Sequence, residues 1–145
     1  MSTEVEIVLV EDNLNDAEMI TRVLKKNCLT NKIIHLKDGA EAIDFIFAEG
    51  EYSSRNIADT PRVIFLDLKM PRISGIEVLK KIKSDERTKQ IPIVVLTSSK
   101  EDPDIKTCFE LGANSYVVKP VQFEKFVSAV AELGMYWTVL NQPPK

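Results

Sequence analysis

The sequence has few of the residues that stabilise secreted proteins or anchor proteins in membranes. Its 145 residues include two cysteines, Cys28 and Cys108, with no CxxC pair and no histidine cluster beside them. We therefore expect reduced, buried thiols in a cytoplasmic protein, not disulfides or a cysteine metal site. No apolar run approaches the roughly 20 residues of a membrane span. The acidic N-terminus runs straight into a strand-like segment, so we expect no signal peptide and no membrane contact.

The sequence also lacks an excess of positive charge. The chain has 19 lysine and arginine residues against 22 aspartate and glutamate residues, a formal net charge of −3. Nucleic-acid binding needs a concentrated basic surface to neutralise phosphates, so we expect no direct nucleic-acid partner. The length suits one domain and leaves no room for a second. We expect a single domain over 1–145, in which 134–145 form an aromatic tail beyond the core.

Short apolar runs alternate with amphipathic helical stripes along the whole chain. The runs predict buried strands, and they lie at residues 7–10, 32–36, 63–66, 93–96 and 116–118. Strands that are continuous apolar runs are typical of a parallel sheet with helices on both faces. The sequence therefore predicts an α/β fold with a doubly wound parallel sheet of five strands. We expect the one long polar connection, 49–61, to be a surface excursion.

Reactive side chains follow these runs at the points where the strands end. Glu11 and Asp12 follow the first run, and Asp67 follows the third. Thr97 and Lys119 follow the fourth and the fifth. Because ligands of such a sheet bind outside the carboxyl ends of its strands, we expect these side chains to converge at one rim.

The converging residue types suit phosphoryl transfer supported by a divalent cation. Clustered carboxylates repel one another unless a cation is present, and Glu11, Asp12 and Asp67 offer the oxygen ligands that suit Mg²⁺. Asp67 can accept a phosphoryl group as an acyl phosphate. Thr97 can donate a hydrogen bond to one phosphoryl oxygen, and Lys119 can place its charge beside another. A role for Glu11 and Asp12 in helix-dipole stabilisation alone would leave Asp67 unexplained.

These residues belong to segments that resemble the receiver domain of two-component response regulators, the CheY-like family. The similar segments cover nearly the whole chain in the family's order, at residues 8–13, 65–71, 75, 94–98, 112–113 and 116–120. The resemblance implies a flavodoxin-like (βα)5 fold with the strand order 2-1-3-4-5. It also implies phosphorylation by a sensor histidine kinase, in a signalling phosphoacceptor that is not a metabolic enzyme.

The resemblance assigns a metal-binding role to one half of the rim. Asp67 matches the phosphoacceptor and one ligand of Mg²⁺. Asp12 matches a direct metal ligand, and Glu11 matches its acidic neighbour. The backbone carbonyl of Lys69 matches the third protein ligand of the metal.

The other half of the rim matches the switch of the family. Thr97 matches the switch hydroxyl, and Tyr116 the switch aromatic whose ring turns inward when that hydroxyl moves. A packing role for Tyr116, as an edge-strand tyrosine against the last helix, is compatible with this. Lys119 matches the lysine that pairs with the phosphoryl group, and its bond to Pro120 matches a cis peptide. Phosphorylation then repacks the face made by the fourth helix, the fifth strand and the fifth helix.

Two further features resemble the small stand-alone regulators that are paired with bacterial phytochromes, particularly cyanobacterial ones. One is the long connection 49–61, and the other is the tail 134–145 with Tyr136 and Trp137; residues 91–99 contribute to the same resemblance. The resemblance implies a red-light sensor kinase as partner and a homodimer that uses the aromatic pair. The pair can also fold back over the core of its own chain.

Three other functions stay open. A Mg²⁺-dependent phosphohydrolase would share the aspartyl-phosphate, but it carries a second acid two residues after the nucleophile, where this chain has Lys69. A flavin-binding domain would need a phosphate loop rich in Gly, Ser and Thr in place of residues 11–16. A pseudo-receiver would bind a partner without being phosphorylated. His35, the only histidine, falls in the second strand, away from the rim by strand order, which argues against a phosphotransfer role.

Overall fold

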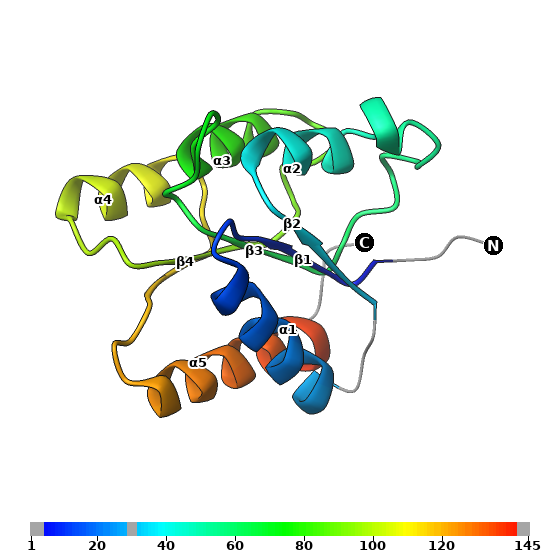
Figure 1. The fold of residues 1–145 in the computed structure, drawn as a ribbon. Helices are drawn as coiled ribbons and strands as arrows, with labels where there is room; N and C mark the ends of the chain where they lie inside the picture. Colours follow the sequence, from blue (N-terminus) through cyan, green and yellow to red (C-terminus); the bar gives the residue numbers. More distant parts are fainter. Residues whose placement is uncertain (1–4, 29–31, 142–145) are drawn as a thin grey trace.

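The chain forms a five-stranded parallel sheet with helices packed on both faces (Figure 1). The computed structural model describes residues 5–28 and 32–141, so the last four residues of the predicted tail lie outside it. The strands are β1 (Ile7–Val10), β2 (Ile33–Leu36), β3 (Val63–Leu66), β4 (Ile93–Thr97) and β5 (Ser115–Val118). All neighbours pair in parallel, in the order β2-β1-β3-β4-β5. The predicted fold class and strand order are confirmed.

A helix follows each strand. The helices are α1 (Leu14–Cys28), α2 (Gly39–Ile46), α3 (Gly75–Lys83), α4 (Asp102–Glu110) and α5 (Phe123–Met135). In Figure 1, α1 and α5 cover one face of the sheet, and α2, α3 and α4 lie on the other side. Side-chain caps fix the N-terminal ends of two helices. At α2, the Asp38 carboxylate accepts the amide of Glu41 at 2.8 Å, and Ser74 caps α3 in the same way.

Two apolar clusters fill the space between the sheet and its helices. Strand side chains alternate between the two faces, and β3 shows the result. Ile64 and Leu66 belong to the cluster beneath α2 and α3. Val63 and Phe65 belong to the cluster beneath α1 and α5. All four are fully buried, which explains why this strand reads as an uninterrupted apolar run.

The long connection between α2 and β3 is folded against α2. It contains a 3-10 turn, Gly50–Tyr52. The Tyr52 ring meets the Phe45 ring edge-on with centroids 5.1 Å apart, and its hydroxyl donates to Glu41 at 3.0 Å. The guanidinium carbon of Arg55 lies 3.9 Å from the centre of the Phe45 ring. The excursion is therefore a packed extension of the α2 layer.

The chain continues after α5 into a π-helical turn, Tyr136–Leu140. Trp137 packs against the cluster beneath α1 and α5, and its ring meets the Tyr136 ring edge-on at 5.0 Å. Thr138 is buried, and its carbonyl accepts the Arg62 side chain at 3.1 Å, which ties the turn to the start of β3. Trp137 thus folds back on its own core, whereas Tyr136 keeps 49% of its surface exposed.

Burial also decides the chemistry of Cys108. Its thiol is buried in the core, and this burial, with the nearby charge of Asp104, raises the pKa of the thiol to about 11. Cys108 is therefore the buried, protonated thiol that the sequence predicts, while the side chain of Cys28 lies outside the described part.

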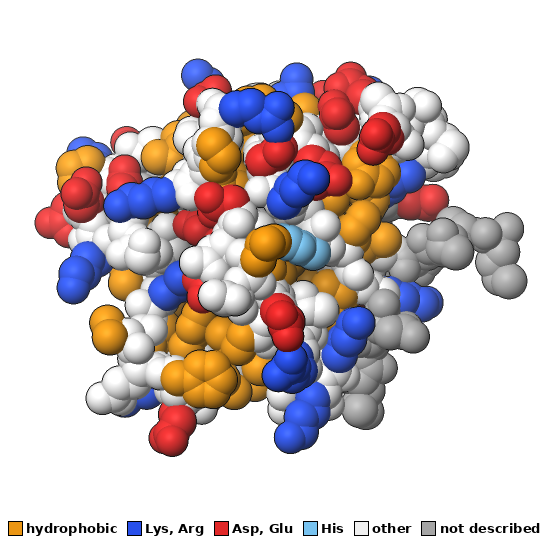
Figure 2. Space-filling view, viewed as in Figure 1, with side chains coloured by type: hydrophobic (Ala, Val, Ile, Leu, Met, Phe, Trp, Pro, Cys, Tyr) orange, Lys and Arg blue, Asp and Glu red, His pale blue; other side chains and the backbone are white. Residues whose placement is uncertain are grey.

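Within the residues that the structure describes, none of the helices has the length and apolar character to cross a membrane. On the face that Figure 2 shows, basic side chains are interspersed with acidic ones.

Candidate functional site

The carboxyl ends of β1 and β3 bring three carboxylates together. Glu11, Asp12 and Asp67 each offer a carboxylate oxygen, and these atoms all lie within 4.8 Å of one another. The register of the sheet produces this, because Val10 of β1 lies opposite Leu66 of β3. Glu11 and Asp67 are buried, at 1% and 7% exposure, while Asp12 faces solvent. The cluster thus has a buried interior and one open side.

Lys119 joins this cluster from the end of β5. Its Nζ donates to Glu11 Oε1 at 2.7 Å, to Asp16 Oδ2 at 2.9 Å and to Asp67 Oδ2 at 3.4 Å. Burial alone lowers the pKa of Lys119, but the hydrogen bonds to Glu11 and Asp16 outweigh it and raise the pKa above its ordinary value. The ammonium group is therefore charged, and it is the cation that holds the carboxylates together.

One lysine does not neutralise this much negative charge. Burial raises the pKa of Glu11 to about 7, a shift that Lys119 opposes and the charge of Asp67 increases. A carboxyl group with such a pKa is half protonated near neutral pH. The cluster therefore favours an additional positive charge, and its open side at Asp12 is the place where one can enter.

Thr97 and Lys69 are linked to residues of the cluster by backbone hydrogen bonds. Thr97 ends β4 with a fully buried side chain, and its carbonyl accepts the backbone amide of Lys119 at 2.7 Å. This bond joins the ends of β4 and β5. The backbone amide of Lys69 lies 3.4 Å from Asp67 Oδ1, so the chain turns back over that carboxylate directly after β3. The structure thus brings all the predicted rim residues to one edge of the sheet.

Tyr116 is connected to the loop that follows Thr97. Its hydroxyl donates to the backbone carbonyl of Ser99 at 2.9 Å, and its ring packs against the cluster beneath α2 and α3. The Ser99 hydroxyl in turn donates to Asp104 in the first turn of α4 at 2.6 Å. The ring therefore packs on the α2 and α3 side of the sheet and not on the last helix, and its hydroxyl is linked through Ser99 to the start of α4.

Gly75 lets α3 begin directly beneath Asp67. A Cβ atom at this position would lie 2.2 Å from the backbone oxygen of Asp67 and 2.6 Å from the Cα atom of Leu68. Both neighbours are backbone atoms, so no side chain can rotate away to make room. Position 75 therefore requires glycine because there is no space for a side chain, and not because of a left-handed backbone conformation. The close approach also fixes the backbone of Asp67.

Replacing Gly75 by Ala is therefore expected to displace Asp67 and to destabilise the fold by about 2 kcal/mol, as overpacking does. If the cluster accepts a phosphoryl group, as the resemblance implies, the rate of phosphorylation by acetyl phosphate should fall at least about tenfold. Gly112→Ala is the matched control: its φ of +106° makes it destabilising too, but the new Cβ would meet only the flexible side chain of Lys83, at 3.3 Å. Urea unfolding measures both stabilities. An unchanged rate in Gly75→Ala would contradict this role of the glycine.

Two expectations from the sequence are wrong. The described residues contain no cis peptide bond, so the bond between Lys119 and Pro120 is trans, the ordinary state of an X–Pro bond. The Lys119 side chain contacts the carboxylates with this bond in the trans form. Strand order predicts His35 away from the rim, but its Nε2 lies 2.7 Å from the backbone carbonyl of Glu11, because β2 is paired directly with β1.

Asp16 is a site residue that sequence reasoning missed. It lies in the first turn of α1, where an acid is common because it stabilises the helix dipole. Its bond to Lys119 depends on how α1 packs across the end of the sheet. The only signal in the sequence is a further acid shortly after Glu11 and Asp12, and this gives no reason to separate Asp16 from an ordinary helix start.

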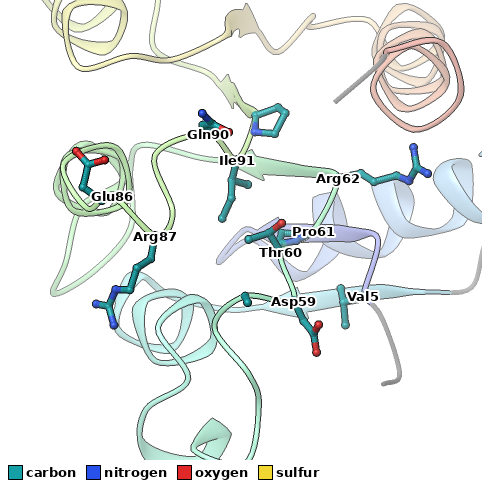
Figure 3. A pocket seen from close by; sticks show the side chains of 11 residues that line it. Val5, Asp59, Thr60, Pro61, Arg62, Glu86, Arg87, Gln90 and Ile91 are labelled. Atoms are coloured by element: carbon teal, nitrogen blue, oxygen red, sulfur yellow. The ribbon is translucent and has the colours of Figure 1, made fainter. Parts of the chain in front are cut away.

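A surface pocket lies at the other end of the sheet (Figure 3). It lies between the segments that enter β3 and β4, and Arg62, Arg87 and Ile91 are among its lining residues. Its arginines already have acidic neighbours, since Arg87 pairs with Asp85 at 2.8 Å and Arg62 lies 3.6 Å from Glu6. The pocket does not communicate with the carboxylates, which lie at the carboxyl ends of the strands.

Comparison with known proteins agrees with this geometry. Residues 7–131 match the model of the response regulator receiver domain. A probable methanogenesis regulatory protein, FilR2 of Methanothrix harundinacea, is 39% identical over 138 residues, 95% of this chain and 86% of that protein. Response regulator Rcp1 of Synechocystis is 35% identical over 131 residues, 90% of this chain and 87% of that protein.

Solved structures of such regulators superimpose closely. The Mn(2+)-bound form of response regulator Rcp1 has a TM-score of 0.88 at 34% identity, covering 96% of this chain and 98% of that one. The phosphorylated cyanobacterial phytochrome response regulator RcpA has a TM-score of 0.90 at 33% identity, covering 98% and 99%. The chain therefore belongs to the response regulator receiver domain family.

Proposed function

We propose that this protein is a stand-alone signalling receiver that accepts a phosphoryl group on Asp67 from a sensor histidine kinase. The observation that carries the proposal is the convergence of three carboxylates and Lys119 at the ends of β1, β3 and β5. An oxygen of Asp67 forms the new bond to phosphorus while the bond to the donor's imidazole nitrogen breaks, and the electron pair stays on that nitrogen.

A divalent cation, Mg²⁺ in the cell, fits the residues present. The cluster offers three carboxylates with oxygens within 4.8 Å, and the exposed Asp12 leaves one side free for the waters that Mg²⁺ keeps. Asp12, Asp67 and the carbonyl of Lys69 would hold it, with Glu11 behind them. A bound cation supplies positive charge to phosphoryl oxygens. The similar regulator Rcp1 has been solved in a Mn(2+)-bound form, which supports a divalent cation here.

The protein's own residues supply the rest of the response. Lys119 is already charged and directed at Asp67, so it can pair with a phosphoryl oxygen by moving away from Glu11 and Asp16. The Thr97 hydroxyl can donate to another oxygen. Movement of Thr97 changes the loop that carries Ser99, and therefore the bonds that link Tyr116 to the start of α4. The face of α4, β5 and α5 is the surface that changes.

Incubation with acetyl phosphate followed by intact-mass measurement tests this function. We expect the mass of one phosphoryl group to be gained with Mg²⁺ present and not with EDTA. Rapid multiple turnover of a phosphomonoester would favour the phosphohydrolase instead. A chain that takes up no phosphoryl group from acetyl phosphate or from a phosphorylated histidine kinase would be a pseudo-receiver.

The comparisons support a phytochrome-type light sensor as the upstream kinase. RcpA is a cyanobacterial phytochrome response regulator, and the similarity to it covers almost the full length of both chains. Histidine kinases transfer phosphoryl groups derived from ATP, so the proposal includes a cytoplasmic location. Reconstitution with a phytochrome kinase under red and far-red light measures this pairing as a light-dependent change in the rate of phosphorylation.

We also propose a homodimer formed through α5 and the turn that follows it. Large apolar side chains are exposed there, including Phe123 at 66%, Tyr136 at 49%, Val139 at 55% and Leu140 at 64%. Figure 2 shows apolar side chains gathered beside α5. Exposed apolar groups concentrated on one element are typical of an interface between proteins.

The double variant Tyr136→Ser, Leu140→Ser is expected to be monomeric at micromolar concentration, where the wild type sediments as a dimer. Serine removes the apolar area that association would bury, while Trp137 stays packed on the core. Leu14→Ser is the control, because Leu14 is 70% exposed but lies on α1. A wild type that sediments as a monomer both before and after phosphorylation would rule out this interface.

A further inference from the structure

His35 completes the β1–β2 ladder at the point where its backbone bonds end. The last backbone bond between the two strands runs from the amide of Glu11 to the carbonyl of Leu36 at 3.1 Å. The carbonyl of Glu11 lies beyond this bond. The Nε2 atom of His35 lies 2.7 Å from that carbonyl oxygen. Because a carbonyl only accepts, Nε2 is the protonated nitrogen and donates to it.

This bond fixes a peptide plane between two carboxylates of the site. The carbonyl of Glu11 belongs to the same rigid peptide unit as the amide of Asp12. The side chain of Glu11 is held separately, by Lys119 at 2.7 Å and by the amide of Asn13 at 3.2 Å. His35 therefore constrains the backbone on which Asp12 is carried, while the other bonds constrain the side chain of Glu11.

Asp12 is the member of the cluster that most needs such a constraint. It is exposed, whereas Glu11 and Asp67 are enclosed by the protein. An exposed carboxylate on a turn binds a cation more weakly when its backbone is free to rotate. The entropy lost when the backbone becomes ordered then opposes binding. A residue that orients a metal ligand without touching the metal measurably changes the affinity for the metal.

We propose that His35 is a positioning residue for the cation site: through the carbonyl of Glu11 it holds Asp12 in place for the metal. The inference rests on the proposed function, because it presumes a cation at the cluster. It gives the only histidine of the chain a role without phosphotransfer, since the ring nitrogen nearest the site is engaged in a bond to the backbone.

The partial exposure of His35 makes the proposal testable by substitution. His35 is half-buried and lines an open groove between α1 and β2, together with Leu14, Ala17 and Thr21. His35→Leu keeps the bulk and removes the donor. His35→Gln keeps a donor, because the amide nitrogen of glutamine is as many bonds from Cβ as Nε2 of histidine. Thr21→Val is the control, a change in the same groove at a residue of α1.

Calorimetric titration of each metal-free variant with Mg²⁺ measures the affinity directly. We expect binding to be roughly fivefold weaker in His35→Leu, the effect of one ordinary hydrogen bond. His35→Gln should restore it to within about twofold, and Thr21→Val should match the wild type. In ¹⁵N-resolved NMR spectra, the amide signals of Asp12 and Asn13 should move in His35→Leu and return toward their positions in His35→Gln.

Phosphorylation by acetyl phosphate separates positioning from general damage. The Mg²⁺ concentration for the half-maximal rate should rise in His35→Leu by the same factor as the dissociation constant, while the rate at saturating Mg²⁺ stays that of the wild type. Equal Mg²⁺ affinities in His35→Leu and wild type would overturn this proposal alone. A loss that glutamine does not restore would overturn it too. A wild-type chain that binds no Mg²⁺ would overturn the proposed function as well.

Discussion

Replacement of Asp67 by Asn is expected to abolish phosphorylation, lowering its rate by more than about a hundredfold. The amide has nearly the shape of the carboxylate, so the side chain still fits its buried position at 7% exposure. It lacks the anionic oxygen that forms the bond to phosphorus. Intact-mass measurement after incubation with acetyl phosphate and Mg²⁺ reads out the result.

The control for this substitution is Asp102→Asn, an exposed acid at the start of α4. It removes the same charge outside the cluster and should be phosphorylated at the wild-type rate. A phosphoryl group gained by Asp67→Asn at that same rate would assign the acceptor to another residue. Asp12 is the next candidate, because its carboxylate is the exposed one of the cluster.

The sequence was sufficient to predict the fold because the pattern of burial is simple. The central strands β1, β3 and β4 are buried along their whole length, so each reads as a nearly continuous apolar run, and a parallel sheet directs all its carboxyl ends to one edge. That geometry places Glu11, Asp67, Thr97 and Lys119 at the same edge independently of the conformation of the loops. The positions of the rim residues therefore follow from strand ends alone.

The contacts that escaped prediction depend on side-chain reach. The bond from His35 to the carbonyl of Glu11 requires the ring to extend past the end of its own strand. The bond from Asp16 to Lys119 depends on the packing of α1 across the rim. Trp137 and Tyr136 are adjacent aromatics, yet the π-helical turn directs one to the core and leaves the other half exposed. Hydrophobic periodicity does not specify any of these.

The metal-free protein is expected to lose stability as the pH rises from about 5 to 8. Glu11 has a pKa of about 7 in the folded protein against 4.5 ordinarily, so the folded state binds more protons than the unfolded state between these values. Its contribution is complete below pH 4.5 and is lost as the pH passes 7, about 3 kcal/mol in all. Urea unfolding in EDTA at several pH values measures the slope.

Two variants isolate the cause of this slope. Glu11→Gln removes the titrating group and should flatten the dependence of stability on pH. Asp38, whose pKa is lowered, acts in more acidic solution, whereas Lys83, whose pKa is lowered to about 8, begins to act at the alkaline end of this range.

Lys119→Met should steepen the slope, because it removes the cation that favours ionised Glu11 in the metal-free cluster. Leaving a buried charge without its partner costs about 3 kcal/mol at high pH, and acidification or added Mg²⁺ should recover most of it. Mg²⁺ should therefore stabilise Lys119→Met more than it stabilises the wild type. Equal stabilisation of both would show that Lys119 and the metal do not compensate the same carboxylates.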